Sequence, residues 1–205
     1  RVEDIDLLQE EIAAARDAGF TDATWVEDAG LPGWPGPGAR FPRQARFHPT
    51  KYLDGLVHAL ERRGARIFDH SPVGNLEETD GGVRATTPDG HSIHARQVVV
   101  ATNAPFHLRI PIHTKQAPYR TYVIAAPVPK GAAPDALVWD TAEPAYHYVR
   151  IVPGEDGDLL LVGGEDHKTG EADDMEARIR ELAHWARARW PQLGEVRYQW
   201  SGQVI

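Results

Sequence analysis

The sequence of 205 residues contains no cysteine, and this absence removes several classes of protein from consideration. Without thiols the chain has no disulfide framework, no thiolate-bound metal or iron–sulfur cluster of its own, and no cysteine nucleophile. No apolar run approaches the roughly 18–20 residues of a membrane-spanning helix. The longest apolar runs are Val98–Ala101, Leu159–Val162 and Tyr122–Val128. We therefore expect a chain without a membrane span.

Several binding and catalytic motifs are also missing. The sequence has no Gly-x-Gly-x-x-Gly and no Gly-x-x-x-x-Gly-Lys-Ser/Thr, so no phosphate-binding loop opens a helix. It has no Gly-x-Ser-x-Gly elbow, which leaves hydrolysis by a serine nucleophile without support. Lys and Arg total 22 against 30 Asp and Glu, for a formal net charge of −8. This acidic balance makes nucleic acid and anionic membranes poor candidates as partners.

The first half of the chain combines predicted helices and strands. Apolar residues three and four apart predict an amphipathic helix over Glu3–Arg16. The segment Gly30–Pro42, with four Pro and four Gly, predicts a loop. A second helix is expected between Pro49 and Gly64. The predicted strands are Ala65–Phe68, a hairpin over Val83–Ala95 around Pro88-Asp89-Gly90, and Val98–Ala101, whose consecutive valines indicate burial on both faces.

Beyond Pro105 the sequence is dominated by predicted strands. These segments are rich in β-branched and aromatic residues and are bounded by Pro or Gly, which is typical of an antiparallel region. One helix is expected over Asp173–Arg189. We predict an α+β (α/β) fold in which the later strands form a sheet of their own. They are Tyr119–Ala126, Ala145–Val152, Asp158–Val162 and Glu195–Trp200.

The ten histidines do not predict a metal site. His91 and His94 lie three apart in a predicted strand, hence on opposite faces, and no third ligand accompanies them. We assign Asp166, with the acids at 173 and 174, to the start of the following helix, where carboxylates interact favourably with the helix dipole. His167 stays a candidate because it follows Leu159–Gly164, a predicted buried strand that ends in two glycines and leaves room for a ligand.

Four stretches carry a resemblance to a known family. They read RFHPTKYLDGLVHALERRGARIFDHSPV, VRATTPDGHSIHARQVVVATNAP, YHYVRIVPGEDGDLLLVGGEDHKTG and QWSGQVI. From about His48 onward the chain resembles the middle of the D-amino-acid-oxidase-type FAD-dependent oxidoreductases. The segments HTKQAPYRTYV and GGEDHKTG resemble the subgroup that often carries a Rieske iron–sulfur domain downstream.

The resemblance implies a mixed-sheet substrate domain plus a partial Rossmann-like FAD-binding domain. It assigns residues 1–45 to the first part of the substrate domain and a linker, and residues 46–105 to the FAD-binding part. Residues 106–200 continue the substrate domain, and 201–205 start the return to the FAD domain. The chain begins without Met and ends after a strand-like run, so we interpret it as an internal fragment. The lack of cysteine fits a reducing compartment, and we expect a cytoplasmic enzyme.

The resemblance also implies which residues meet the cofactor of the intact parent. Val73 resembles the strand valine whose backbone contacts the adenine. The turn of Ala101, Thr102 and Asn103 resembles the one that packs against the flavin nucleotide, and Asn tolerates the left-handed backbone that Gly adopts in many relatives. Gly202 belongs to the strand end that leads back to the FAD domain. Because the dinucleotide fingerprint is absent, we expect no cofactor on this chain alone, and no activity.

On the substrate side the resemblance implies oxidation of an amine or amino acid by hydride transfer to flavin, and the flavin itself does the chemistry. Our candidate catalytic residues are Lys115, Tyr148 and His167. Lys115 would orient water or bind a carboxylate, unless it is an ordinary solvated lysine. Tyr146 and Arg150 alternate with Tyr148 on one predicted strand and are the candidate substrate-binding residues, unless the three only pack on the sheet.

One alternative from another class stays open. A non-catalytic binding or scaffold module could keep the same architecture without the cofactor. A Gly-x-Gly-x-x-Gly upstream in the gene and a continuation after Ile205 would favour the enzyme, and a natural start near Arg1 would favour the module. The sequence predicts a small-molecule partner but indicates neither the substrate, nor the electron acceptor, nor the oligomeric state.

Overall fold

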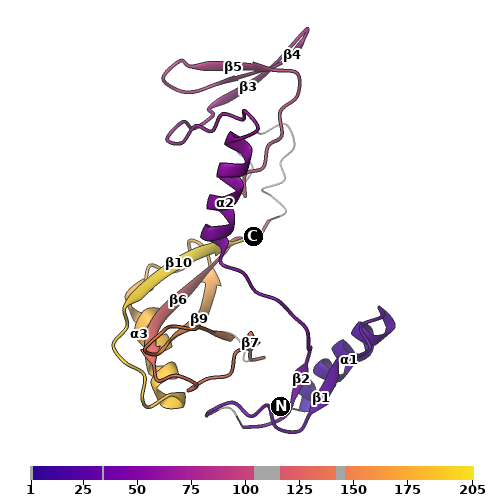
Figure 1. Ribbon diagram of the computed structural model, residues 1–205, viewed down its shortest axis with the longest axis vertical. Helices are drawn as coiled ribbons and strands as arrows, with labels where there is room; N and C mark the ends of the chain where they lie inside the picture. The colour runs from indigo at the N-terminus through magenta and orange to yellow at the C-terminus, as the bar shows by residue number, and fades with distance from the viewer. Residues whose placement is uncertain (1, 34, 104–115, 142–145) are drawn as a thin grey trace. The chain divides into compact units, whose positions relative to one another are not determined.

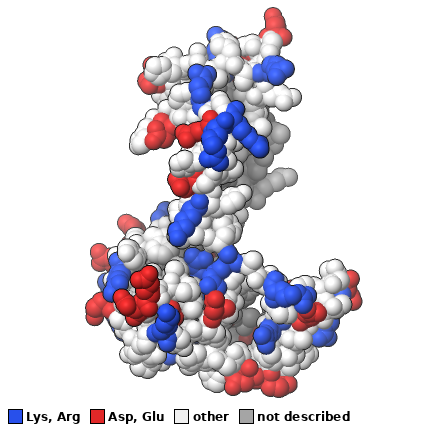
Figure 2. All heavy atoms as spheres, viewed as in Figure 1, with Lys and Arg blue, Asp and Glu red and all other residues white. Residues whose placement is uncertain are grey.

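The computed structural model describes residues 2–33, 35–103, 116–141 and 146–205 (Figure 1). Contacts divide the chain into two compact units, and each is described by itself. Unit 1 consists of Arg1–Arg43 and Ala117–Ile205, and unit 2 of Gln44–Gln116. Within the described residues, no helix combines the length and apolar character needed to cross a membrane. On the face shown in Figure 2, acidic and basic side chains are interspersed rather than gathered into one cationic area.

Unit 1 is built around a five-stranded antiparallel sheet. Its strands are β6 (Tyr119–Val128), β7 (Val138–Trp139), β8 (His147–Val152), β9 (Asp158–Lys168) and β10 (Tyr198–Val204), in the spatial order β10-β6-β9-β8-β7. Every neighbouring pair is antiparallel. The prediction of a separate sheet from the later strands is therefore confirmed, and β7 is an addition to it.

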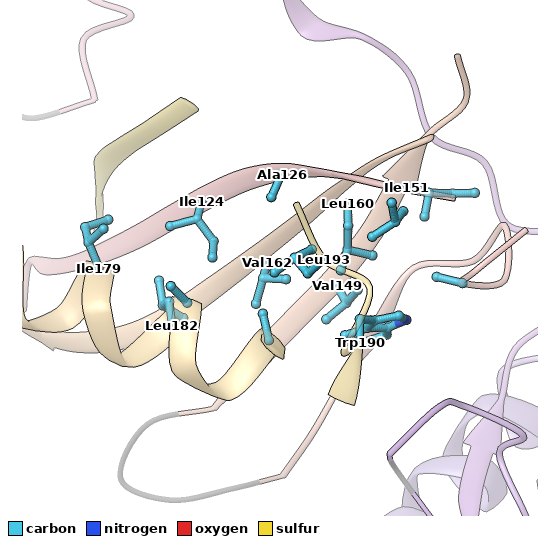
Figure 3. Close-up of a cluster of buried hydrophobic side chains, with 14 of the residues drawn as sticks. Ile124, Ala126, Val149, Ile151, Leu160, Val162, Ile179, Leu182, Trp190 and Leu193 are labelled. Atoms are coloured by element: carbon cyan, nitrogen blue, oxygen red, sulfur yellow. The ribbon is translucent and has the colours of Figure 1, made fainter. Parts of the chain in front are cut away.

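Helix α3 (Met175–Arg189) covers one face of this sheet. Because side chains alternate along a strand, every second residue of β6, β8 and β9 faces the helix. Ile124, Leu160 and Val162 are almost fully buried there against Ile179 and Leu182 of the helix (Figure 3). Burying a large aliphatic side chain contributes about 1.5–3 kcal/mol. This contact is the main core of the unit.

The predicted helix over Asp173–Arg189 agrees with α3 to within two residues. Asp174 is its N-cap residue and accepts a hydrogen bond from Arg178 Nε at 2.8 Å. The helix ends at Arg189, and Trp190 is its C-cap residue, just before Pro191. The buried Trp190 indole donates from Nε1 to the Ala132 carbonyl at 3.2 Å. That bond satisfies the polar atom of the largest fully buried side chain.

The N-terminal part of unit 1 contains α1 (Val2–Asp17) and two short paired strands, β1 (Thr24–Val26) and β2 (Gly38–Arg40). The helix is confirmed. The prediction that Gly30–Pro42 is entirely a loop is wrong, because its last glycine begins β2. Three residues are enough for this pairing with β1, and Pro37 precedes the strand, where its missing N–H is not needed.

Unit 2 consists of α2 (Pro49–Glu61) and a three-stranded antiparallel sheet of β3 (Asn75–Thr79), β4 (Gly82–Thr86) and β5 (Ser92–Ala95). The His48 side chain caps the helix by accepting from the Lys51 amide at 3.4 Å. The hairpin predicted over Val83–Ala95 is confirmed. Strand β3 was not predicted, although Asp80-Gly81 before β4 is a hairpin-turn signal.

Two strands predicted in unit 2 are wrong. Residues 65–68 and 98–101 form no strand, and no described strand pairs with either segment. Val99 is 87% exposed, so the valine run is not buried on either face. A run of valines indicates only apolar character. A buried parallel strand also needs partner strands on both sides and helices on both faces. None of these is present in the part of the chain that the structure describes.

We predict that Leu182→Ala in α3 lowers the free energy of unfolding by about 2–5 kcal/mol, because the leucine is fully buried and its removal leaves a cavity. Leu7→Ala in α1 is the matched control, since Leu7 is 50% exposed. The control should shift stability by less than about 0.5 kcal/mol. Chemical denaturation of both variants followed by circular dichroism provides the measurement, and equal losses would show that α3 does not close the core.

Candidate functional site

The face of the unit 1 sheet opposite α3 carries the candidate site. Directly paired residues lie on the same face, so the strand register places Tyr148, Gly163, Val123 and Trp200 in one row across β8, β9, β6 and β10. The aromatic residues at the two ends of this row flank small or apolar residues in its middle. We refer to this side of the sheet as the open face, because α3 packs on the other side.

Gly163 determines how Tyr148 lies on the open face. A side chain at position 163 would fall inside the Tyr148 ring, so only glycine lets the ring lie over the backbone of β9. The Tyr148 hydroxyl is 3.2 Å from Thr121 Oγ1, and Thr121 pairs with Gly202 on β10. Burial raises the pKa of Tyr148, which keeps the phenol neutral at pH 7. The structure thus brings two predicted site residues, Tyr148 and Gly202, together through Thr121.

Tyr146 lies at the start of the same row of alternating residues. Its hydroxyl donates to Asp166 Oδ2 at 3.1 Å, and its ring centroid is 6.2 Å from that of Tyr148. Desolvation, followed by the Asp166 carboxylate, raises the pKa of Tyr146 to about 12. The prediction that Asp166 belongs to the start of the following helix is wrong. Asp166 belongs to β9, because that strand runs on through its two glycines to Lys168.

Arg150 follows Tyr148 on the open face of β8 and lies opposite Leu161. Its side chain is half-buried, and the structure gives it no carboxylate partner among the described residues. A partly desolvated guanidinium normally pairs with an anion. The open face therefore presents a cationic group next to two phenols.

His167 lies on the other face. Its Nε2 is 2.9 Å from the Tyr122 hydroxyl, and the two rings stack with centroids 5.7 Å apart. Tyr122 belongs to the core under α3. The expectation that His167 accompanies Tyr148 is therefore wrong. The reason is a bulge in the pairing of β6 with β9, which interrupts the alternation of side chains before His167. The bulge lies next to Gly164 and Glu165, both of which have positive φ.

A second polar cluster lies under α3 and supports β8 from behind. His147 is 6% exposed, and its ring stacks on Trp185 at a centroid distance of 4.2 Å. Its Nδ1 is 3.1 Å from Asp140 Oδ2, and its Nε2 is 3.6 Å from Glu165 Oε1. This cluster fixes the strand that carries Tyr146 and Tyr148. The sequence does not indicate this cluster, because His147 is one histidine between two tyrosines and only its burial in the structure distinguishes it from a surface histidine. No described group of His, Asp and Glu residues could hold a metal ion.

The remaining predicted site residues do not join the open face. Lys115 lies outside the described residues. Val73 and the turn of residues 101–103 belong to unit 2 and are exposed. Arg150 lines a small cavity together with Val149 and Trp190, and the second described cavity is lined by residues of unit 2.

The family model for FAD dependent oxidoreductases, DAO, matches residues 1–204, and the chain belongs to this family. It is 27% identical over 165 residues to the putative Rieske 2Fe-2S iron–sulfur protein YhfW of Bacillus subtilis, covering 79% of this chain and 31% of that protein. It is 30% identical over 170 residues to the probable oxidoreductase OrdL of Haemophilus influenzae, covering 77% of this chain and 37% of that protein. The chain thus spans about a third of these relatives, and the family resemblance is confirmed.

Solved structures show the same fold. Glycine oxidase from Geobacillus kaustophilus superposes with a TM-score of 0.74 at 19% identity, covering 98% of this chain and 55% of that one. NikD, an amino acid oxidase of nikkomycin biosynthesis, superposes with a TM-score of 0.75 at 17% identity, covering 96% of this chain and 56% of that one. The α+β class predicted from the sequence, with its mixed helices and antiparallel sheets, is thereby confirmed as the fold of these oxidases.

We predict that Gly163→Ala destabilises the protein by about 1–3 kcal/mol, because the new methyl group collides with the Tyr148 ring. The same substitution in a Tyr148→Ala background should cost less than half as much. Gly55→Ala, at a helical position with open space around it, is the control and should be neutral or stabilising. Denaturant unfolding of the double-mutant cycle tests this, and additive effects would show that the two residues do not interact.

Proposed function

We propose that this chain supplies the substrate-binding sheet, and part of the FAD-binding domain, of an oxidoreductase that oxidises an amine or amino acid. Family membership supports the redox class. The oxidases of similar fold support this substrate class. The observation that carries the proposal is the open face, where a half-buried Arg150 that has no anionic partner among the described residues lies beside Tyr148. A substrate carboxylate would be the missing partner.

The residues of the open face would bind and orient the substrate. Arg150 would hold its carboxylate through two parallel N–H bonds, a geometry that fixes direction as well as position. Tyr148, neutral and in contact with Thr121, would place the amine by hydrogen bonding. Bound FAD would accept the hydride. We assign no general base, because His167 faces the core and an amine that arrives deprotonated needs none.

Unit 2 would belong to the FAD-binding domain, as its match to the family model supports. Val73 and the turn of Ala101, Thr102 and Asn103 would contact the cofactor in the intact parent. The exposed valines at 98–100 would be covered by the strands of the remaining domain. The relative YhfW supports a Rieske domain elsewhere in the parent. That domain would then determine which electron acceptor the enzyme uses.

We predict that the 205-residue chain alone is colourless and binds FAD negligibly. The pyrophosphate has no helix N-terminus with a glycine-rich loop to hold it. Isothermal calorimetry with FAD tests this, and ADP in place of FAD separates weak adenine contacts near Val73 from contacts to the flavin. Submicromolar FAD binding, or a flavin spectrum after purification, would contradict the prediction.

We predict that Arg150→Gln in the full-length protein lowers kcat/KM for its best amino-acid substrate by about tenfold or more, since a charge-assisted bond to the carboxylate is lost. The effect on the matching amine without a carboxylate should be within about twofold. Arg180→Gln is the control, because Arg180 is exposed on α3 and pairs only with Glu176 among described residues.

The measurement is anaerobic loss of the visible absorbance of oxidised flavin, which needs no knowledge of the acceptor. Substrates come from a screen of amino acids and their decarboxylated amines. If Arg150→Gln and Arg180→Gln behave alike on the amino acid, the open face is not the substrate site. If no amine or amino acid bleaches the flavin, the substrate class is wrong.

A further inference from the structure

Asp166 lies beside Tyr146 on the open face, and the described residues satisfy only one of its two carboxylate oxygens. Its Oδ2 accepts from Tyr146, but its Oδ1 is shielded from solvent and accepts no hydrogen bond. Among the described residues Asp166 also has no ion pair, while other acids of β9 and α3 do. A shielded carboxylate oxygen without a donor is unfavourable, and native structures seldom leave one so.

The surroundings of Asp166 suit a cation. The rings of Tyr146 and Tyr148 lie 6.2 Å apart next to the carboxylate, and aromatic faces attract ammonium and guanidinium groups. The residue as a whole remains partly exposed, although Oδ1 itself is shielded from solvent. The donor that the described residues supply to it, the Tyr146 hydroxyl, is neutral and leaves the negative charge uncompensated.

Asp166 and Arg150 stand at opposite ends of the site. Tyr146, which binds Asp166, and Arg150 are four residues apart along one strand direction, which is about 13 Å between their Cα atoms, with Tyr148 between them. The open face therefore has a negative end and a positive end, with the aromatic ring lying over Gly163 in the middle.

We propose that Asp166, held by Tyr146, is a subsite for a second, cationic group of the substrate. The preferred substrate would then carry a carboxylate for Arg150, the amine to be oxidised near Tyr148, and a distal ammonium or guanidinium group for Asp166. This rests on the proposed function, since that function makes the open face the substrate site. It adds a specificity determinant, and Asp166 takes no part in the redox step.

The test compares two probes that differ in one group. N-(3-aminopropyl)glycine carries a distal ammonium, and N-butylglycine carries a methyl group in its place. Binding of each to the full-length protein is measured by calorimetry. We expect the ammonium probe to bind about tenfold or more tightly, and Asp166→Asn to reduce the preference to less than about twofold, because a hydrogen bond to an ionised group is lost.

Asp173→Asn removes one negative charge from an exposed position close in sequence and is the control for net charge. It should leave the preference unchanged. Equal binding of the two probes to the wild type, no measurable binding of either, or a preference that survives Asp166→Asn would overturn the subsite. Turnover is scored separately: if the probes bind with the expected preference but no amine or amino acid bleaches the flavin, the subsite stands and the proposed reaction fails.

Discussion

The packing of α3 on one face of the antiparallel sheet is the contact on which the rest of unit 1 depends. Leu160 and Leu182 are fully buried in it, and the alternation of β6, β8 and β9 assigns every other residue to this core. The same alternation commits the remaining residues to the open face. Once the helix has taken one side, Tyr148 and Arg150 have only the other side to occupy, and their chemistry becomes available to a ligand.

Two neighbouring glycines then shape the open face. Gly163 gives the Tyr148 ring its place, and Gly164, with φ of 144°, takes part in the irregularity that turns the end of β9. Beyond it Glu165 faces the core with His147, Asp166 faces Tyr146, and His167 returns to the core with Tyr122. Inserting or deleting one residue in this short segment would move each following side chain to the opposite face of the sheet.

Much of this organisation could be predicted from the sequence. The helices and later strands follow from hydrophobic periodicity and from Gly and Pro at their ends, and the shared face of Tyr148 and Arg150 follows from the period of a strand. The position of His167 could not be predicted, because a bulge leaves no periodic signal and the glycine pair suggested a strand end. The predicted burial of the valines at 98–100 was wrong for another reason. Their burial depends on partner strands, and a local sequence pattern does not indicate whether these are present.

The central claim is that the open face, and not the face under α3, receives the substrate. A crystal structure of the full-length protein with FAD and a bound amino-acid inhibitor tests it most directly. We predict that the inhibitor carboxylate lies within hydrogen-bonding distance of the Arg150 guanidinium and that the Tyr148 ring lines the same site. An inhibitor bound elsewhere, with another part of the protein packed against Tyr148 and Arg150, would contradict the account.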